Sequence, residues 1–109
     1  MVKRAYHNYW VYIITNKPRG ILYIGVTGGI DDRMERHLNG TGGYFSSKYK
    51  LKHLVYYEEY QYITDAIRRE KQLKNWHRAW KINLIESQNP DWTNLWVPLG
   101  SVDPEPSSG

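Results

Sequence analysis

The chain has 109 residues, of which 40% are hydrophobic and 24% charged, and its formal net charge is +4. This length fits a single domain, and the absence of cysteine excludes disulfides, thiol catalysis and Cys-based zinc sites. No apolar run approaches the ~20 residues that span a bilayer, and the N-terminus does not read as a signal peptide. We therefore expect a cytoplasmic protein with no membrane partner. The basic excess favours a polyanionic partner such as nucleic acid, although ordinary soluble proteins can be equally basic.

The N-terminal part of the chain reads as a β-hairpin. Residues 9–15 are aromatic or β-branched and predict a strand, residues 16–20 carry turn chemistry, and residues 21–26 predict a second strand. If Thr15 pairs with Gly20, Tyr12 falls opposite Tyr23. Both phenols then share one face of the sheet, because side chains alternate along a strand.

A helix follows the glycines after the second strand. Asp31 and Asp32 suit its first turn, where carboxylates complement the helix dipole, and it should end near Gly40. Arg33 and His37 lie one turn apart beside an apolar line. That line consists of Ile30, Met34 and Leu38.

The rest of the chain predicts one more strand and two helices. Residues 40–50 read as a loop, and the third strand falls within residues 51–60. The pattern predicts a helix over 64–75 with Thr64 as its N-cap, and another over 76–87. Asn89-Pro90 should end the last helix. Trp92 and Trp96, which follow it, should pack back on the domain.

These elements define the expected architecture. The order β-β-α-β-α-α predicts an α/β fold, an α+β sandwich in which helices flank a small three-stranded sheet. We expect this domain to occupy residues 1–98 and residues 99–109 to form a disordered tail.

Glu70 stands out within a basic helix. It lies in the middle of an apolar stripe that includes Ala66, Ile67 and Leu73. A carboxylate on such a face needs a compensating cation, a metal or dense hydrogen bonding. It either pairs with a neighbouring Arg or Lys at an exposed edge, or binds a hard divalent cation such as Mg²⁺.

Four other side chains have both a structural and a functional interpretation. Arg33 either pairs with a neighbouring acid, Asp32 or Glu35, or binds a phosphate through its planar fork. His37 is either solvated or structural, or a general acid or base. Tyr12 and Tyr23 either fill the core, as strand tyrosines usually do, or line a site.

Basic side chains gather in two further segments. The 40–50 loop combines lysines with aromatic rings that could meet a nucleic-acid strand, and the 64–75 helix has a basic side that is either solvated or tracks phosphates. The candidate nucleic-acid-binding residues are Lys48 and Lys50 in the loop, beside Tyr44, Phe45 and Tyr49, and Arg68, Arg69 and Lys74 on the helix.

Taken together, these residues resemble the motifs of the GIY-YIG nuclease superfamily, above all its small single-domain bacterial members. The first motif stands here as Trp10-Val11-Tyr12, which keeps only the tyrosine, and the second is intact as Tyr23-Ile24-Gly25. The family's arginine, histidine and metal-binding glutamate fall on Arg33, His37 and Glu70. The segment Asn89-Pro90-Asp91-Trp92 is also typical of the small members.

The resemblance implies a three-stranded antiparallel sheet. It also implies an endonuclease with a role in DNA repair, which hydrolyses phosphodiester bonds of DNA, with RNA as the alternative substrate, in a structure-directed or nonspecific manner. It implies that Glu70 holds one Mg²⁺ or Mn²⁺ ion, Arg33 stabilises phosphoryl charge, Tyr12 with Tyr23 orients or deprotonates water, and His37 assists. The family's late asparagine falls on either Asn83 or Asn89. The alternatives are a non-catalytic nucleic-acid-binding module and a protein-interaction domain.

Overall fold

The computed structural model describes residues 8–97, so the tail expected over 99–109 lies outside the described residues. The predicted order of elements is confirmed, with one short helix added between α1 and β3. The elements are β1 (Tyr9–Thr15), β2 (Leu22–Thr27), α1 (Ile30–Asn39), α2 (Tyr44–Lys48), β3 (His53–Tyr60), α3 (Ile63–Asn75) and α4 (Arg78–Gln88).

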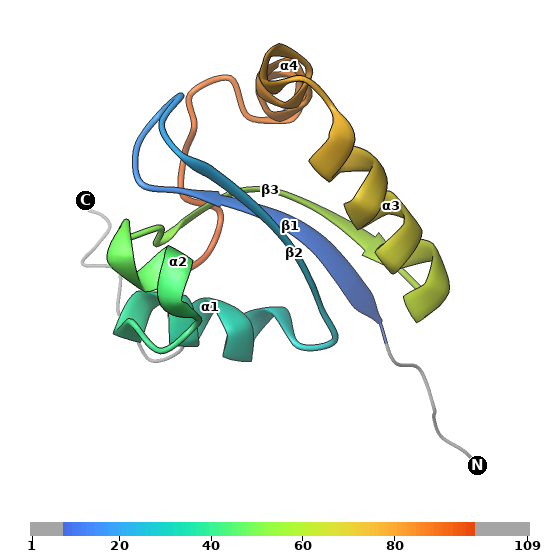
Figure 1. The fold of residues 1–109 in the computed structure, drawn as a ribbon, viewed down its shortest axis with the longest axis horizontal. Coiled ribbons are helices and arrows are strands. Elements are labelled where there is room, and N and C mark those ends of the chain that lie inside the picture. The colour runs from blue at the N-terminus through green and yellow to red at the C-terminus, as the bar shows by residue number, and fades with distance from the viewer. Residues whose placement is uncertain (1–7, 98–109) are drawn as a thin grey trace, which may run out of the picture.

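A three-stranded sheet divides the molecule into two halves. Its strand order is β2-β1-β3, and β1 pairs with both neighbours in the antiparallel sense, as expected. Helices α1 and α2 lie on one side of the sheet, and α3 and α4 lie on the other (Figure 1). Because strand side chains alternate, the central strand β1 supplies residues to both halves.

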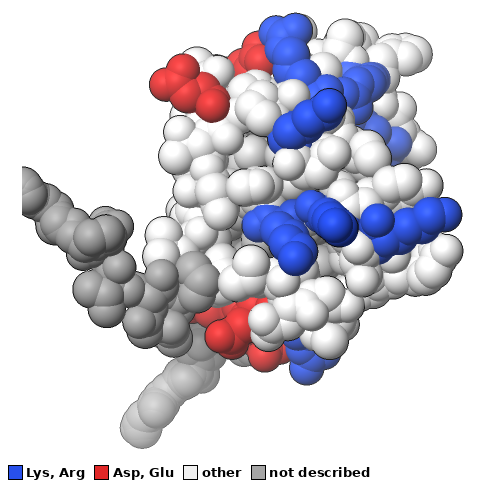
Figure 2. Space-filling view, turned by 90° about the vertical axis from the view of Figure 1, so that its left-hand side faces the viewer, with Lys and Arg blue, Asp and Glu red and all other residues white. Residues whose placement is uncertain are grey.

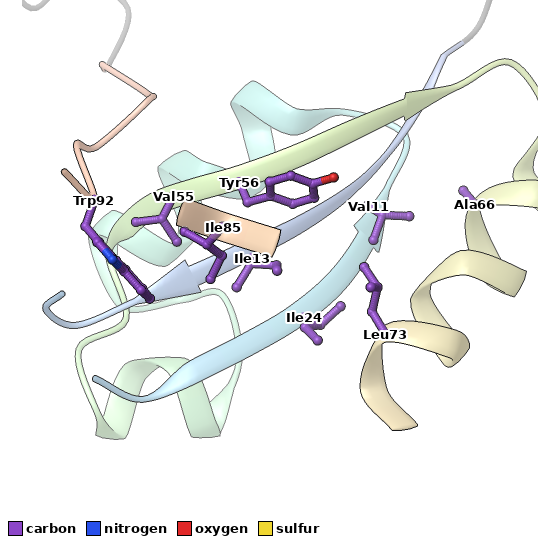
Figure 3. Packing of buried hydrophobic residues seen from close by; sticks show 9 residues of the cluster. All are labelled: Val11, Ile13, Ile24, Val55, Tyr56, Ala66, Leu73, Ile85 and Trp92. Atoms are coloured by element: carbon purple, nitrogen blue, oxygen red, sulfur yellow. The ribbon is translucent and has the colours of Figure 1, made fainter. Parts of the chain in front are cut away.

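Each half has its own buried cluster. Val11 of β1 lies near Leu73 of α3, and Ile13 lies beside Ile85 of α4 (Figure 3). On the opposite face, Tyr12 and Ile14 of β1 pack with Met34 of α1. The predicted docking of the C-terminal tryptophans is confirmed. Trp92 belongs to the first cluster and Trp96 to the second.

The register of the hairpin differs from the one predicted. Thr15 pairs with Leu22 rather than with Gly20, and Tyr12 therefore lies opposite Gly25 instead of Tyr23. The connecting loop is longer than expected because Asn16 accepts a hydrogen bond from the backbone N–H of Ile21 through its side-chain oxygen. The error is two residues, which preserves the alternation, so Tyr12 and Tyr23 still share one face.

The helix boundaries agree with the predicted ones to within a few residues, with three corrections. Helix α1 ends at Asn39, and its C-cap Gly40 has a left-handed φ of 80°. Within the helix, Leu38 of the predicted apolar line is exposed, and His37 is buried in its place. Helix α3 begins at Ile63, so Thr64 lies inside the helix and does not cap it. Helix α4 begins at Arg78 rather than at residue 76.

Within residues 8–97, no helix is long and apolar enough to cross a membrane.

Candidate active site

Three aromatic rings meet on the face of the sheet that α1 covers. The hydroxyl of Tyr12 lies 3.1 Å from Nε2 of His37, and each residue is 1% exposed. The ring of Tyr23 lies 6.4 Å from that of Tyr12 and 6.0 Å from that of His37, between centroids. A strand pair and a helix thus bring together three residues that lie up to 25 positions apart.

Two glycines leave room for this arrangement. Gly25 lies opposite Tyr12, and a Cβ there would come within 2.5 Å of the Tyr12 hydroxyl oxygen. Gly42 lies against His37, where a Cβ would come within 2.5 Å of Nδ1. The glycine of the second motif therefore serves close packing of the tyrosine ring.

Ser46 of α2 extends the Tyr12–His37 pair. Its Oγ lies 2.9 Å from Nδ1 of His37 and donates a 3.4 Å hydrogen bond to the carbonyl of Gly43. With the serine proton directed at Gly43, the consistent assignment of protons is that Nδ1–H of His37 donates to Ser46 and Nε2 accepts from Tyr12. Sequence reasoning missed Ser46, because nothing in residues 40–50 signalled a helix that would carry it to His37.

The pKa values of the pair fit this assignment of protons. Burial, and then the neighbouring Tyr23, raise the pKa of Tyr12 well above its usual range, while Arg33 lowers it and Glu70 raises it to a smaller extent. Burial and the charge of Arg33 lower the pKa of His37 to about 4. Both groups are therefore neutral near pH 7, as a phenol donating to an imidazole requires.

Arg33 lies next to these rings with its charge uncompensated. The residue is partly buried, and its field acts on both Tyr12 and His37. Its neighbour Asp32 pairs instead with Arg36, at 3.2 Å. Within residues 8–97 the Arg33 side chain makes no ion pair and no hydrogen bond. The expected alternative of a neighbouring acid partner is therefore wrong, and the guanidinium is available to an anion.

Glu70 comes from the other layer, on α3. Its side chain is 15% exposed, and it pairs with Nζ of Lys74 at 3.0 Å. Of the two interpretations of Glu70 given above, the structure therefore shows the ion pair with a neighbouring lysine. The link of Glu70 to the ring cluster is electrostatic, since its charge raises the pKa of Tyr12. Like Arg33, Glu70 is linked to the ring cluster through its charge, and within residues 8–97 neither side chain makes a hydrogen bond or a ring contact with Tyr12, Tyr23 or His37.

The chemistry of Glu70 still fits a weak divalent-ion site. Within the described part of the chain, no three His, Asp or Glu side chains gather as a metal site would require. Mg²⁺ nevertheless often takes one carboxylate, several waters and substrate phosphates. Lys74 is half exposed and can turn into solvent, which would free the carboxylate.

The predicted nucleic-acid-binding residues fall into two groups. Lys48 is the last residue of α2 and Lys50 follows it, and both are exposed. Lys and Arg side chains lie across the middle of the face that Figure 2 shows. On α3, Arg68 pairs with Asp65 at 3.1 Å. The side chain of Arg69 is 22% exposed and bound to Glu58. Helix α3 therefore presents fewer free cations than its sequence suggests.

Neither candidate asparagine joins the rings. The side chain of Asn89 bonds the carbonyls of Val55 and Thr93 and the N–H of Thr93, which fixes the turn after α4 to β3. Asn83 lies on α4 in an open depression that it shares with Trp80.

Comparison with known proteins assigns this small α+β domain to a family of catalytic domains. The family model for the GIY-YIG catalytic domain matches residues 8–83, and the chain belongs to this family. UPF0213 proteins of Staphylococcus aureus strains Mu3 and N315 are 32% identical over 81 residues, which cover 74% of this chain and 98% of each relative. The solution NMR structure of a UPF0213 protein from Bacillus halodurans matches with a TM-score of 0.52 and 28% identity, covering 80% of this chain and 92% of that one.

Proposed function

We propose that the protein is a metal-dependent endonuclease that hydrolyses DNA phosphodiester bonds in a structure-directed or nonspecific manner. The observation that carries this proposal is the unpaired guanidinium of Arg33 beside the hydrogen-bonded Tyr12–His37 pair. A partly buried cation with no acid beside it is suited to an anion that arrives from outside. Membership of a nuclease family makes a phosphodiester the anion of choice.

Arg33 would hold the scissile phosphate and stabilise the charge that grows on its oxygens in the transition state. The bound phosphate would also offset the positive field of Arg33 at His37. Because that field lowers the pKa of His37 in the free protein, phosphate binding would raise the proton affinity of the imidazole. Binding of the substrate would thereby make His37 a better proton acceptor.

The two tyrosines would divide the handling of water. Tyr12 is 1% exposed, whereas Tyr23 is partly exposed and its hydroxyl has no hydrogen-bond partner within residues 8–97. Tyr23 therefore meets water first and orients it. As the water attacks phosphorus, its proton passes to the oxygen of Tyr12 while the proton of Tyr12 moves to Nε2 of His37. The leaving oxygen departs with the electron pair of the broken P–O bond.

Glu70 would hold Mg²⁺ or Mn²⁺ once Lys74 has turned away. When bound, such an ion supplies positive charge to the scissile phosphate and the leaving oxygen. One carboxylate gives little affinity, so we expect binding of the ion to depend on the substrate phosphate.

The test is cleavage of single-stranded, duplex and branched DNA, and of RNA, with and without Mg²⁺ or Mn²⁺. Arg33→Ala and Glu70→Ala should each reduce cleavage about 100-fold or more. The matched controls are Arg36→Ala and Asp65→Asn, since each changes a charge on the same helix that is already ion-paired. Cleavage that survives both site changes would contradict the assignment. Salt-sensitive binding without cleavage of any substrate would favour the non-catalytic binding module.

A further inference from the structure

A run of stacked rings leads from the candidate site to the surface. Tyr23, which contacts both Tyr12 and His37, stacks on Phe45 of α2 with centroids 6.2 Å apart and planes at 29°. Phe45 in turn contacts Tyr49, with centroids 4.9 Å apart. The contacts between rings are therefore continuous from the buried hydroxyl of Tyr12 to the outside of α2.

The outer rings of this run are unusually open to solvent. Phe45 is 44% exposed, Tyr49 39% and Tyr44 79%. Helix α2 is five residues long and Tyr49 is its C-cap, so three rings are exposed within six consecutive residues. A concentration of exposed apolar surface of this kind is typical of a binding site.

A lysine side chain lies against two of the same rings. Nζ of Lys48 lies 5.7 Å from the centroid of Tyr44 and 5.4 Å from that of Tyr49. Residues 40–52 contain three lysines and no acidic residue. The surface around α2 therefore combines flat apolar faces with positive charge, and its charge is complementary to a phosphate backbone.

We propose that Phe45 and Tyr49, flanked by Tyr44, form a stacking platform for an unpaired nucleobase next to the scissile phosphate, with Lys48 contacting the backbone. This inference rests on the proposed function and specifies its substrate class. Aromatic side chains stack on bases of any sequence, and nearby cations follow the backbone. Within a duplex both faces of each base are covered by neighbouring bases. The platform therefore selects a single strand, a flap or another unpaired segment.

Two other exposed rings of the described chain, Trp80 and Tyr62, make no ring contact with Tyr12, Tyr23 or His37. Trp80 is 54% exposed, but its ring contacts are Trp76 and His77 on the α3–α4 side. Tyr62 is 60% exposed and precedes α3. Exposure alone does not distinguish the rings on α2, whereas the stacking contact between Phe45 and Tyr23 does. Tyr62 therefore serves as a matched control.

The test is equilibrium binding by fluorescence anisotropy in EDTA, where metal-dependent cleavage cannot occur. The probes are a short labelled oligothymidylate, an abasic strand of the same length, and a blunt duplex. The abasic strand keeps the phosphates and removes the bases. We expect the wild-type protein to bind oligothymidylate about 5- to 100-fold more tightly than the abasic strand.

Phe45→Leu and Tyr49→Leu should each remove most of that preference while leaving abasic binding unchanged. Both leucines keep an apolar side chain at a half-exposed position, which protects the fold, and Tyr62→Leu should keep the full preference. Equal binding of the two strands by the wild-type protein, or an equal loss in Tyr62→Leu, would overturn the platform. A base preference without cleavage under any metal condition would instead overturn the nuclease and leave the platform standing.

Discussion

The two faces of the sheet carry similar sets of side chains in opposite electrostatic states. On the α3 face, Tyr56 and Tyr60 both donate to Glu58, and Arg69 binds the same carboxylate at 2.9 Å. On the α1 face, the charges of Arg33 and, more weakly, Glu70 act on Tyr12, which lies beside Tyr23. Glu70 is ion-paired with Lys74, however, and within residues 8–97 no carboxylate is ion-paired with Arg33. Each face thus has two tyrosines and an arginine, but only one has an acid that neutralises the cation.

That difference separates a structural cluster from a candidate binding site. Around Glu58 each charge has a partner, and the ring of Trp76 covers the guanidinium of Arg69 at 5.1 Å. Around Arg33 the positive charge is left over, and it lowers the pKa of His37. A fold that tolerates an uncompensated cation in a partly buried position gains nothing in stability from it. An anion from outside the chain, as in the function proposed above, would compensate it.

The largest expected effect comes from exchanging the two arginines for alanine. Arg69→Ala leaves the carboxylate of Glu58 without its cation, and we expect a loss of about 3 kcal/mol in the free energy of unfolding. Arg33→Ala removes a charge without a partner, so its free energy of unfolding should stay within about 0.5 kcal/mol of the wild-type value. Urea denaturation followed by circular dichroism measures both.

This pair of variants also tests the comparison between the two faces. The nuclease proposal expects Arg33→Ala to be folded but inactive and to bind DNA less tightly. If Arg33→Ala unfolds as readily as Arg69→Ala, Arg33 supports the fold and the contrast is lost.

The next largest effect concerns the glycine under the Tyr12 ring. Gly25→Ala places a Cβ within 2.5 Å of the Tyr12 hydroxyl oxygen, and the buried ring has no free space to move into. We expect a loss of about 1–3 kcal/mol in the free energy of unfolding. At Gly29 the nearest atom to an added Cβ is 4.0 Å away, so Gly29→Ala is the steric control. Because Gly29 is the N-cap of α1, where alanine is disfavoured, we expect it to cost less than about 1 kcal/mol. Equal effects of the two changes would contradict the close packing at Gly25.

The role of Gly25 shows where sequence reasoning succeeded and where it did not. The aromatic, β-branched run of residues 9–15 predicted β1 to the residue, because strand signals are local. The register of the hairpin depends on how the side chain of Asn16 organises the loop, which no local periodicity encodes. The two-residue error placed Tyr12 opposite Tyr23 and concealed the packing of its ring over Gly25.

In the candidate site, too, local features could be predicted from the sequence and contacts between distant segments could not. Hydropathy assigned Leu38 to the interior of α1, yet His37 lies there because Tyr12 and Ser46 satisfy its two ring nitrogens. Such hydrogen bonds join segments far apart in the chain, so single-residue polarity does not predict them. Helix α2 was missed for a related reason, since five residues are too few to show a helical period.

Because His37 is buried, the free energy of unfolding should fall as the pH is lowered. The pKa of His37 is lowered to about 4 in the folded protein, against about 6.5 in the unfolded chain. Between these values the unfolded state binds more protons, so stability falls as the pH drops from about 6.5 to 4, by at most about 1.4 kcal/mol per pH unit. Urea denaturation across this pH range should show the slope of the unfolding free energy against pH. His37→Gln should remove the contribution of His37 to that slope. The control is His53→Gln, because His53 is exposed. An unchanged slope in His37→Gln would contradict the assignment.

The smallest expected effect isolates the outer end of the hydrogen-bonded chain. Ser46→Ala removes the acceptor of Nδ1–H of His37 and should cost about 1 kcal/mol of unfolding free energy, as one buried hydrogen bond does. Without that acceptor the proton of the imidazole is free to move from Nδ1 to Nε2. A protonated Nε2 can no longer accept the hydrogen bond from Tyr12. Nitrogen chemical shifts of the ring, measured by NMR, distinguish the two tautomers. Ser47→Ala is the control, because the neighbouring Ser47 side chain makes no hydrogen bond within residues 8–97. If Ser46→Ala keeps the Nδ1–H tautomer, Ser46 does not set the direction of the chain, and the burial of His37 alone fixes its proton.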